Sequence, residues 1–397
     1  MLITHYLSEP CPLCGSSRSY GNVNVNDNVL NRGCNACGKW TRIYLPDLSK
    51  RIIYLDQFFL SHAFRQQEQP FVEAAKRIED MAHRQLLVCP FSSVHTDETH
   101  LWRHDQQQNL YKFIKQTARG YKFSQAHDIK LTQMVRAFEA FIANDTFLQT
   151  INSKDAFREN VHRWDDYFWI DLRPILGDLD AMRKGKADSV AELVGLFPQW
   201  AQLNSTFQED VRSEAFGYGR ELFNQYIAMA FRMATSGDFS DYLTASIDTI
   251  FVQNLIHFDE KSMDIDDRLK RIVSFFRSDY FVATPYVEVS CGLFAVLRKM
   301  VKNGAFKNPS KAQKKLAGLY YDSECISVFG PYCDAMFIDR AMMQWCNDPE
   351  AMVLNKHNTR VFSVEVWDEF HRFLDQIEAD APNEIDKYLA MVYRPNA

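Results

Sequence analysis

The chain has little glycine and proline, no excess of positive charge and no long apolar segment, and each absence excludes a class of protein. Its 397 residues include only 15 Gly and 13 Pro, while 46% of the residues are hydrophobic. This composition argues for a compact globular protein and against a disordered one. The length allows two or three domains with ample buried core.

Charge and hydropathy exclude further classes. The net charge of −6 at pH 7 rules out a uniformly basic nucleic-acid coat, so any nucleic-acid surface must be local. No uncharged apolar run reaches the roughly 18–20 residues of a membrane span, and we expect no signal peptide at the N-terminus. The sequence also lacks a glycine-rich phosphate loop, because its glycine clusters do not follow strand-like runs.

Cysteine is sparse and unevenly distributed. The nine cysteines are an odd number, and four of them form two Cys-x-x-Cys knuckles, Cys11 with Cys14 and Cys34 with Cys37. This spacing is typical of metal binding in a reducing compartment, so we expect a cytoplasmic protein. Four thiolates complete a tetrahedral shell with no open position, which predicts a structural zinc ion. The ribbon of residues 1–48 should fold only with this metal.

The ribbon has two alternative roles. The stretch between the knuckles is rich in Asn, Gly and Val, which favours a short β-hairpin. The ribbon either contacts nucleic acid through basic side chains or docks against the next domain. Its candidate basic contacts are Arg18, Arg32, Lys39 and Arg42.

Three segments follow the ribbon. Residues 49–103 carry strand, helix and strand signals of buried character, which predict the first half of a parallel α/β domain. Over residues 104–282 the apolar residues recur with helical period, which predicts a large helical insertion. Residues 283–397 return to mixed signals and form the second half of the α/β domain. The main expected elements are strands at 51–56, 85–91 and 360–363 and helices from 58, over 70–83 and over 287–300.

Three widely separated acids lie where an apolar run meets a helix-start signal. Asp56 ends the run Ile52–Leu55, and Glu98 lies six residues after Ser92, in the turn that follows the second apolar run. Asp334 is expected to open a helix. Acids at strand ends can converge on one divalent cation, because hard cations prefer oxygen ligands. Such a site suits metal-assisted hydrolysis of a phosphodiester.

Each acid also has an ordinary explanation. Asp56 is in a position to cap the following helix. Asp97 is the alternative ligand beside Glu98, and His95 and His100 nearby would aid proton transfer or simply face solvent. The expected helix after Asp334 places Ile338 at +4 on its stripe, and a carboxylate on an apolar stripe is costly unless it is paired, capping or metal-bound.

The three acids resemble the motifs of PIN-like nucleases. Tyr54 to Gln57, Ser92 to Glu98 and Pro331 to Ala335 are similar to the first-strand aspartate, the early helix glutamate and the late Asp-Ala helix start of that family. The resemblance covers roughly residues 50–100 and 283–375. It implies a parallel-sheet α/β domain that cuts RNA or DNA with Mg²⁺ or Mn²⁺.

The fourth acid of the family is unresolved. Many PIN-like domains have Thr-x-Asp after the last strand, and this chain has Ser363-Val364-Glu365 instead. Glu365, Asp368 and Asp339 therefore all remain candidates for that position.

A basic segment precedes the third acid. No acid occurs between Glu288 and Asp322, and Phe306 and Tyr320 lie among or beside its cations as candidates for base stacking. A local positive strip in an acidic protein predicts a phosphate-binding surface, and a solvated helix and loop is the alternative. Its cations are Arg298, Lys299, Lys302, Lys307, Lys311, Lys314 and Lys315.

The sequence therefore predicts a metal-dependent nuclease with a PIN-like domain, a zinc ribbon and a helical insertion. RNA is the expected substrate because the resemblance favours it, and DNA is the alternative. The resemblance is also compatible with a toxin or defence effector, which no residue decides. The rival prediction is a non-catalytic module that binds nucleic acid or protein. A protein partner or a second copy at the helical insertion is a further expectation.

Overall fold

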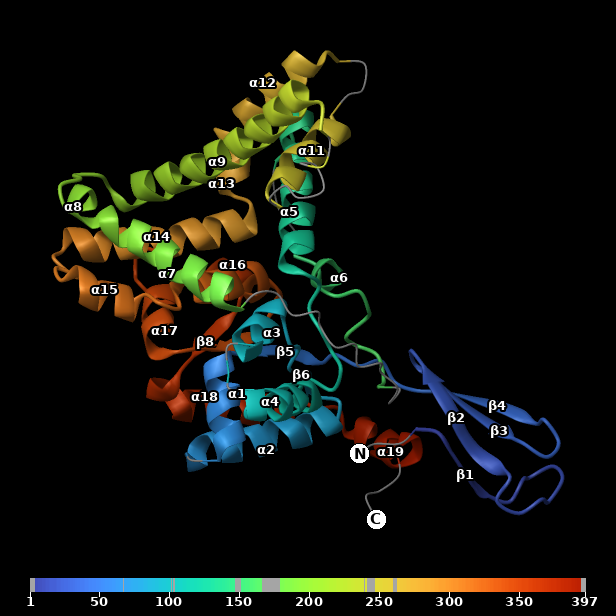
Figure 1. Cartoon of the computed structure of the whole chain (residues 1–397). Helices are drawn as coiled ribbons and strands as arrows, with labels where there is room; N and C mark the ends of the chain where they lie inside the picture. Colours follow the sequence, from blue (N-terminus) through green and yellow to red (C-terminus); the bar gives the residue numbers. More distant parts are fainter. Residues whose placement is uncertain are drawn as a thin grey trace.

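Figure 1 shows a computed structural model with an antiparallel ribbon, a parallel sheet between helices and a larger helical part. The structure describes residues 4–66, 68–100, 102, 104–146, 151–165, 179–238, 240, 247–259 and 263–393. None of the helices in these ranges is long and apolar enough to cross a membrane.

The ribbon is a four-stranded antiparallel sheet in sequence order. One of its faces packs against the C-terminal helix α19 (Asn383–Val392), where Leu30 joins Trp164 and Ile385 in one apolar cluster. The side chain of Asn22 donates hydrogen bonds to the carbonyl oxygens of Met391 and Val392, at 2.8 and 3.1 Å. The ribbon therefore docks against the rest of the chain. Its strands are β1 (Tyr6–Glu9), β2 (Tyr20–Asn26), β3 (Val29–Cys34) and β4 (Trp40–Tyr44).

The second sheet is parallel throughout and has the order β6-β5-β7-β8. The inner strand β5 (Arg51–Leu55) comes from the first half of the expected α/β domain. The neighbouring β7 (Ala335–Phe337) and β8 (Arg360–Phe362) come from the second half, and β6 (Leu87–Val88) forms the other edge. The mixed α/β class predicted from the apolar runs is therefore present.

The parallel sheet is buried on both faces because the side chains of β5 alternate between two cores. Ile52 and Tyr54 join the large core of the helical part, and Ile53 and Leu55 join a second core. A strand covered on both sides reads as a continuous apolar run, which is what the sequence shows there. The second core is formed with α1 (Gln57–Arg65), α2 (Gln69–His83), α4 (His104–Thr117) and α18 (Trp367–Ala379).

Helices dominate the region between the two halves of the sheet. The longest, α9 (Phe207–Ser236), begins with a capping box between Thr206 and Glu209 and ends at Gly237, whose φ of 68° suits a left-handed cap. The described residues of this region also form α5 (Ala126–Ala143), α6 (Ser153–Ala156), α7 (Leu179–Gly195), α8 (Phe197–Trp200), α11 (Thr249–Phe258), α12 (Ile265–Phe276) and α13 (Asp279–Val282). After them come α14 (Pro285–Lys302), α15 (Pro309–Lys315) and α16 (Leu319–Phe329).

The helix expected to open at Asp334 is absent. The residues after it form the short strand β7, and the helix α17 (Arg340–Cys346) begins only after Asp339. All residues from Ala335 to Ile338 are buried, so apolar positions at helical spacing did not distinguish a helix from a strand covered on both faces. The prediction was therefore wrong about the element, although it located the apolar run.

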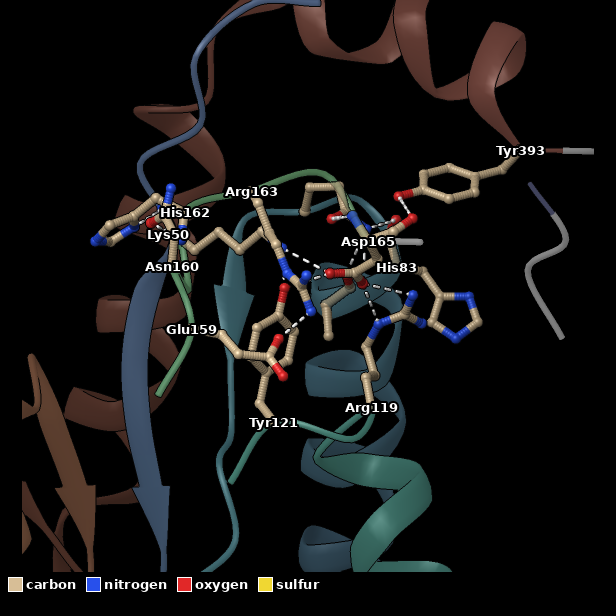
Figure 2. A network of polar contacts seen from close by, with 12 residues as sticks. Lys50, His83, Arg119, Tyr121, Glu159, Asn160, His162, Arg163, Asp165 and Tyr393 are labelled. Carbon is tan, nitrogen blue, oxygen red and sulfur yellow. Dashed lines mark hydrogen bonds and ion pairs between the residues drawn. The ribbon is translucent and has the colours of Figure 1, made fainter. Parts of the chain in front are cut away.

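A buried polar network joins four distant segments (Figure 2). Asp165 accepts hydrogen bonds from Lys50 at 2.8 Å, Tyr121 at 2.5 Å and Arg119 at 2.8 Å. The hydroxyl of Tyr393 donates to the backbone carbonyl of Asp165 at 2.9 Å. The network thus connects the end of the ribbon, the loop after α4, the segment before residue 166 and the end of α19.

Candidate functional site

The four ribbon cysteines form a compact cluster. Their sulfur atoms all lie within 4.8 Å of one another. The sulfurs of Cys11 and Cys37 are 3.7 Å apart, and those of Cys14 and Cys34 are 3.9 Å apart. A tetrahedron with zinc–sulfur distances of about 2.3 Å has edges of about 3.8 Å. The cluster is therefore compatible with a structural zinc ion.

The backbone around each knuckle follows the expected tight turn. Gly15 and Gly38 have φ of 70° and 71°, a conformation that favours glycine. Each donates a hydrogen bond to the carbonyl of the first cysteine of its knuckle, at 2.9 and 3.1 Å. Local sequence alone is enough to form this geometry once metal is present.

Asp56 lies at the carboxyl end of β5, an inner strand of the parallel sheet. It occupies the N-cap position of α1, yet its side chain makes no capping hydrogen bond. Its backbone NH donates to the carbonyl of Phe337 at the end of β7, at 3.0 Å. Ligands bind beyond the carboxyl ends of the strands in open α/β sheets, so Asp56 is in the position expected of a site residue.

Glu98 is held beside Asp56 by the contacts of α3 (Ser93–His100). The buried ring of His95 donates through Nε2 to the carbonyl of Leu55 at 2.8 Å and accepts through Nδ1 from the NH of Ser92 at 3.0 Å. Burial also lowers the pKa of His95 to about 4. Both ring nitrogens are engaged and the ring is neutral, so His95 attaches α3 to the strand and is unsuited to proton transfer.

Asp339 follows the neighbouring strand and reaches the same edge. One oxygen of its side chain caps α17, accepting from the NH groups of Ala341 and Met342 at 2.6 and 3.0 Å. The capping position is what directs the carboxylate back toward the end of β7. Asp56 and Asp339 thus extend from two adjacent parallel strands, and Glu98 from the helix after the third.

The three carboxylates interact electrostatically. The pKa of Asp56 is raised from 3.8 to about 7, first by burial and then by the negative charges of Glu98 and Asp339. Nearby backbone NH groups of Gln57 and Phe58 limit the increase. A carboxylate placed at such a cost is typical of a functional site, because an opposing positive charge would remove the cost.

Asp334 does not belong to this cluster. It precedes β7, whereas Asp339 follows it, so the two acids lie at opposite ends of the same three-residue strand. Its carboxylate accepts from the guanidinium of Arg51 and from the NH of Ile52, both at 2.8 Å. Asp334 therefore joins the start of β7 to the start of β5, and this position is incompatible with a shared metal site with Asp56.

The other candidate acids, Asp97, Glu365 and Asp368, also lie outside the cluster. Asp97, the alternative to Glu98, is half-buried, and its pKa is raised by burial and by Glu324 instead of by Asp56. Glu365 is exposed and forms an ion pair with Arg340 at 2.5 Å. Asp368 is exposed in the first turn of α18. Asp339 is therefore the third acid of the cluster.

The donor atoms at this edge suit a hard divalent cation. Besides three carboxylates, the buried amide oxygen of Gln57 has no hydrogen-bond partner among the described residues, while its nitrogen donates to Thr99 beside Glu98 at 3.1 Å. Within the described residues, however, only the four cysteines form a compact set of three or more metal-ligating side chains. Mg²⁺ is commonly bound through one or two carboxylates with several waters, so a Mg²⁺ site does not require three carboxylates in one compact set.

Family models, curated proteins and solved structures gave no match to this chain. Its function is therefore inferred from the residues and their placement.

The expected basic strip divides into two groups. Arg298, Lys299 and Lys302 on α14 are held in ion pairs. Arg298 and Lys302 contact the buried carboxylate of Asp210 at 3.3 and 2.5 Å, and Lys299 pairs with Asp348 at 3.0 Å. The second group is exposed on or before α15 and comprises Lys307, Lys311, Lys314 and Lys315.

Asp339 also has a local signal in the sequence. Asp339 follows the apolar run Ala335–Ile338 directly, as Asp56 follows Ile52–Leu55. The same rule that selected Asp56 would have selected Asp339. The expected helix from Asp334 placed Asp339 within a helix instead of at the end of a strand.

Proposed function

We propose that this protein is a divalent-metal-dependent nuclease in which Asp56, Glu98 and Asp339 bind Mg²⁺ or Mn²⁺. The convergence of three carboxylates at the carboxyl edge of the parallel sheet carries this proposal. It agrees with the PIN-like resemblance in its first two acids and replaces Asp334 by Asp339. RNA is the proposed substrate, in the cytoplasm, and the ribbon cysteines hold structural zinc.

Each residue of the cluster has a separate role in the proposed reaction. Bound Mg²⁺ or Mn²⁺ would supply a nucleophilic water at neutral pH and stabilise charge on the phosphate. Asp56 and Glu98 hold the cation from two elements that His95 joins, so their separation does not depend on a loop. Asp339 adds negative charge at the same edge while its cap keeps its side chain in place. The exposed lysines of α15 attract the phosphate backbone.

A non-catalytic binding module is the rival function. It is favoured by the two capping hydrogen bonds of Asp339, which already give that carboxylate a structural role. The two functions differ in what a divalent cation does. A binding module has no reason to take Mn²⁺ beyond the zinc.

Three asparagine variants test the proposal. An asparagine at 339 keeps an oxygen for the cap but removes the charge, so Asp339→Asn separates capping from metal binding. We expect Asp56→Asn and Asp339→Asn to abolish cleavage of labelled RNA and most of the melting-temperature increase produced by Mn²⁺. Asp334→Asn is the matched control. It loses an exposed ion pair worth about 1 kcal/mol or less. It should keep both the cleavage of RNA and the melting-temperature increase produced by Mn²⁺.

These measurements distinguish the nuclease from the binding module. A wild-type protein that neither cleaves RNA or DNA nor shifts its melting temperature with Mn²⁺ favours the binding module. Full activity in Asp339→Asn, or its loss in Asp334→Asn, would show that the acids have been assigned to the wrong edge of the sheet.

A further inference from the structure

The ribbon has an open face that none of the other described segments covers. In β4 the side chains of Trp40, Arg42 and Tyr44 are exposed, Trp40 at 60% and Tyr44 at 75%. They alternate with Thr41 and Ile43, and Ile43 packs toward α19. Because side chains alternate across a strand, the three exposed residues share the face opposite to the docked one.

Two large aromatic rings with a cation between them define the chemistry of this face. Residues of a strand rise about 3.3 Å each, so Trp40 and Tyr44 are about 13 Å apart along β4. At that distance they cannot stack on each other, and each offers a separate platform. Gly33 lies opposite Trp40 in the register and has no side chain to compete for space beside the indole ring.

The strand neighbours of these residues include two asparagines and Val29, and they carry no negative charge. Asn31 pairs with Arg42 in the register, Asn24 pairs with Asn31, and the two amide side chains form a hydrogen bond at 2.8 Å. Within the described ribbon, the strand residues that share this face by register include neither Asp nor Glu. The acid of β1, Glu9, pairs instead with Arg32 on the docked side.

We propose that this face binds single-stranded nucleic acid, with bases stacked on Trp40 and Tyr44 and a phosphate at Arg42. Stacking on aromatic side chains is open to every base, and unpaired bases are the ones available for it. The asparagine amides offer donors and acceptors to base edges beside the rings. Val29 lies opposite Tyr44 and Val23 lies beside Gly33, so the face also has aliphatic neighbours. The cation between the rings, the amides and the absence of acids among the strand residues on this face favour a phosphate-bearing chain.

This site is separate from the acidic edge and does not depend on cleavage. It lies on the ribbon, whereas the carboxylates lie at the end of the parallel sheet, and the two are distinct in Figure 1. Binding can therefore be measured in the zinc-loaded full-length protein with no added Mg²⁺ or Mn²⁺. Failure of nuclease activity leaves the binding measurement unaffected.

The test is fluorescence anisotropy with a labelled single-stranded RNA, a single-stranded DNA and a duplex. Loss of one stacking platform should weaken single-strand binding between about 5- and 150-fold, so we expect this for Trp40→Ala and for Tyr44→Ala. Trp40→Phe should keep most of the affinity. Arg42→Ala should reduce the slope of log affinity against log salt by roughly 0.7. The duplex should bind no better than its single strand.

Phe231→Ala is the matched control, because Phe231 on α9 is 67% exposed and far from the ribbon in sequence. All variants should keep their zinc content and melting temperature, since the altered side chains are exposed. Wild-type affinity in both Trp40→Ala and Tyr44→Ala would overturn the proposal. So would an unchanged affinity accompanied by a changed oligomeric state, which would identify the face as a contact between copies of this chain.

Discussion

At the scale of single residues, the protonation of Asp56 is the property most directly tied to the proposed function. Its carboxylate has three competing influences: burial and two neighbouring acids favour the neutral form, while backbone NH groups favour the charged form. The balance places its pKa at about 7 in the metal-free protein. A cation bound there would reverse the balance, because it stabilises the charged form.

This balance predicts a pH dependence of stability. Between pH 4 and about 7 the folded state holds a proton on Asp56 that the unfolded state has released, so metal-free stability falls as pH rises, by up to about 4 kcal/mol. Asp56→Asn removes this titration. Relative to wild type, the variant should therefore gain stability as pH approaches 7 and gain none near pH 4. Melting temperatures measured from pH 4.5 to 8 without divalent metal check the prediction, and parallel curves for both proteins contradict it.

At the scale of elements, the ribbon and α19 stabilise each other. The ribbon is too small to have its own core, and its apolar face is completed by Ile385, Val392 and Tyr393 near the end of the chain. Metal binding in the ribbon should therefore also determine how firmly α19 is held.

We predict that Cys37→Ser releases both elements together. The variant should lose its zinc, and amide hydrogen exchange should accelerate in β2, β3 and α19 while β5 and β7 keep wild-type protection. Most of the helical circular dichroism should remain. Mass-spectrometric hydrogen exchange provides the measurement. Protection of α19 equal to that in the wild type would show that the helix does not need the ribbon.

The cations of α14 and α15 are predicted to have different roles. Lys302→Ala leaves the buried Asp210 with fewer partners and should cost about 3 kcal/mol of stability, with little effect on the salt dependence of nucleic-acid binding. Replacing Lys311, Lys314 and Lys315 by Glu should have little effect on stability and should weaken the salt dependence of nucleic-acid binding. Each lost phosphate contact lowers the log–log slope on a single strand by roughly 0.7. An unchanged slope in the triple variant would mean that α15 is only a solvated surface.

At the scale of the whole molecule, the Asp165 network holds together segments that are far apart in sequence (Figure 2). Burial alone would raise the pKa of Asp165, but the charges of Lys50 and Arg119 hold it well below its usual range. Burial lowers the pKa of Lys50, and Asp165 opposes that decrease. The carboxylate of Asp165 remains charged, and its network connects the ribbon linker to the parallel-sheet domain.

Asp165→Asn is predicted to destabilise the whole molecule by about 3–5 kcal/mol, because Lys50 and Arg119 would lose the charge that balances them in a buried position. In the wild type, the contribution of Asp165 is complete above pH 4 and is lost as pH falls below it, since its folded pKa is depressed. Thermal unfolding at pH 7 and pH 3 measures both effects. A variant with the melting temperature of the wild type at pH 7 would remove the network from this role.

Local patterns in the sequence determined the features that depend on neighbouring residues. The Cys-x-x-Cys spacing and the glycines after it specify the knuckles, and the apolar run Ile52–Leu55 before Asp56 specifies a buried strand that ends in an acid. These follow from sequence because turn geometry and strand burial are set within a few residues.

Only the tertiary structure decided which acids meet. Asp334 and Asp339 are five positions apart, yet β7 between them passes through the sheet, so one lies at its amino edge and the other at its carboxyl edge. A helix there would have left Asp334 as the expected ligand. The tertiary structure also decided the partners of Arg298 and Lys302, whose charges are matched by Asp210 on α9, a helix far away in the sequence. Pairing between segments far apart in the chain depends on how both faces of the sheet and the long helices pack, which no local pattern contains.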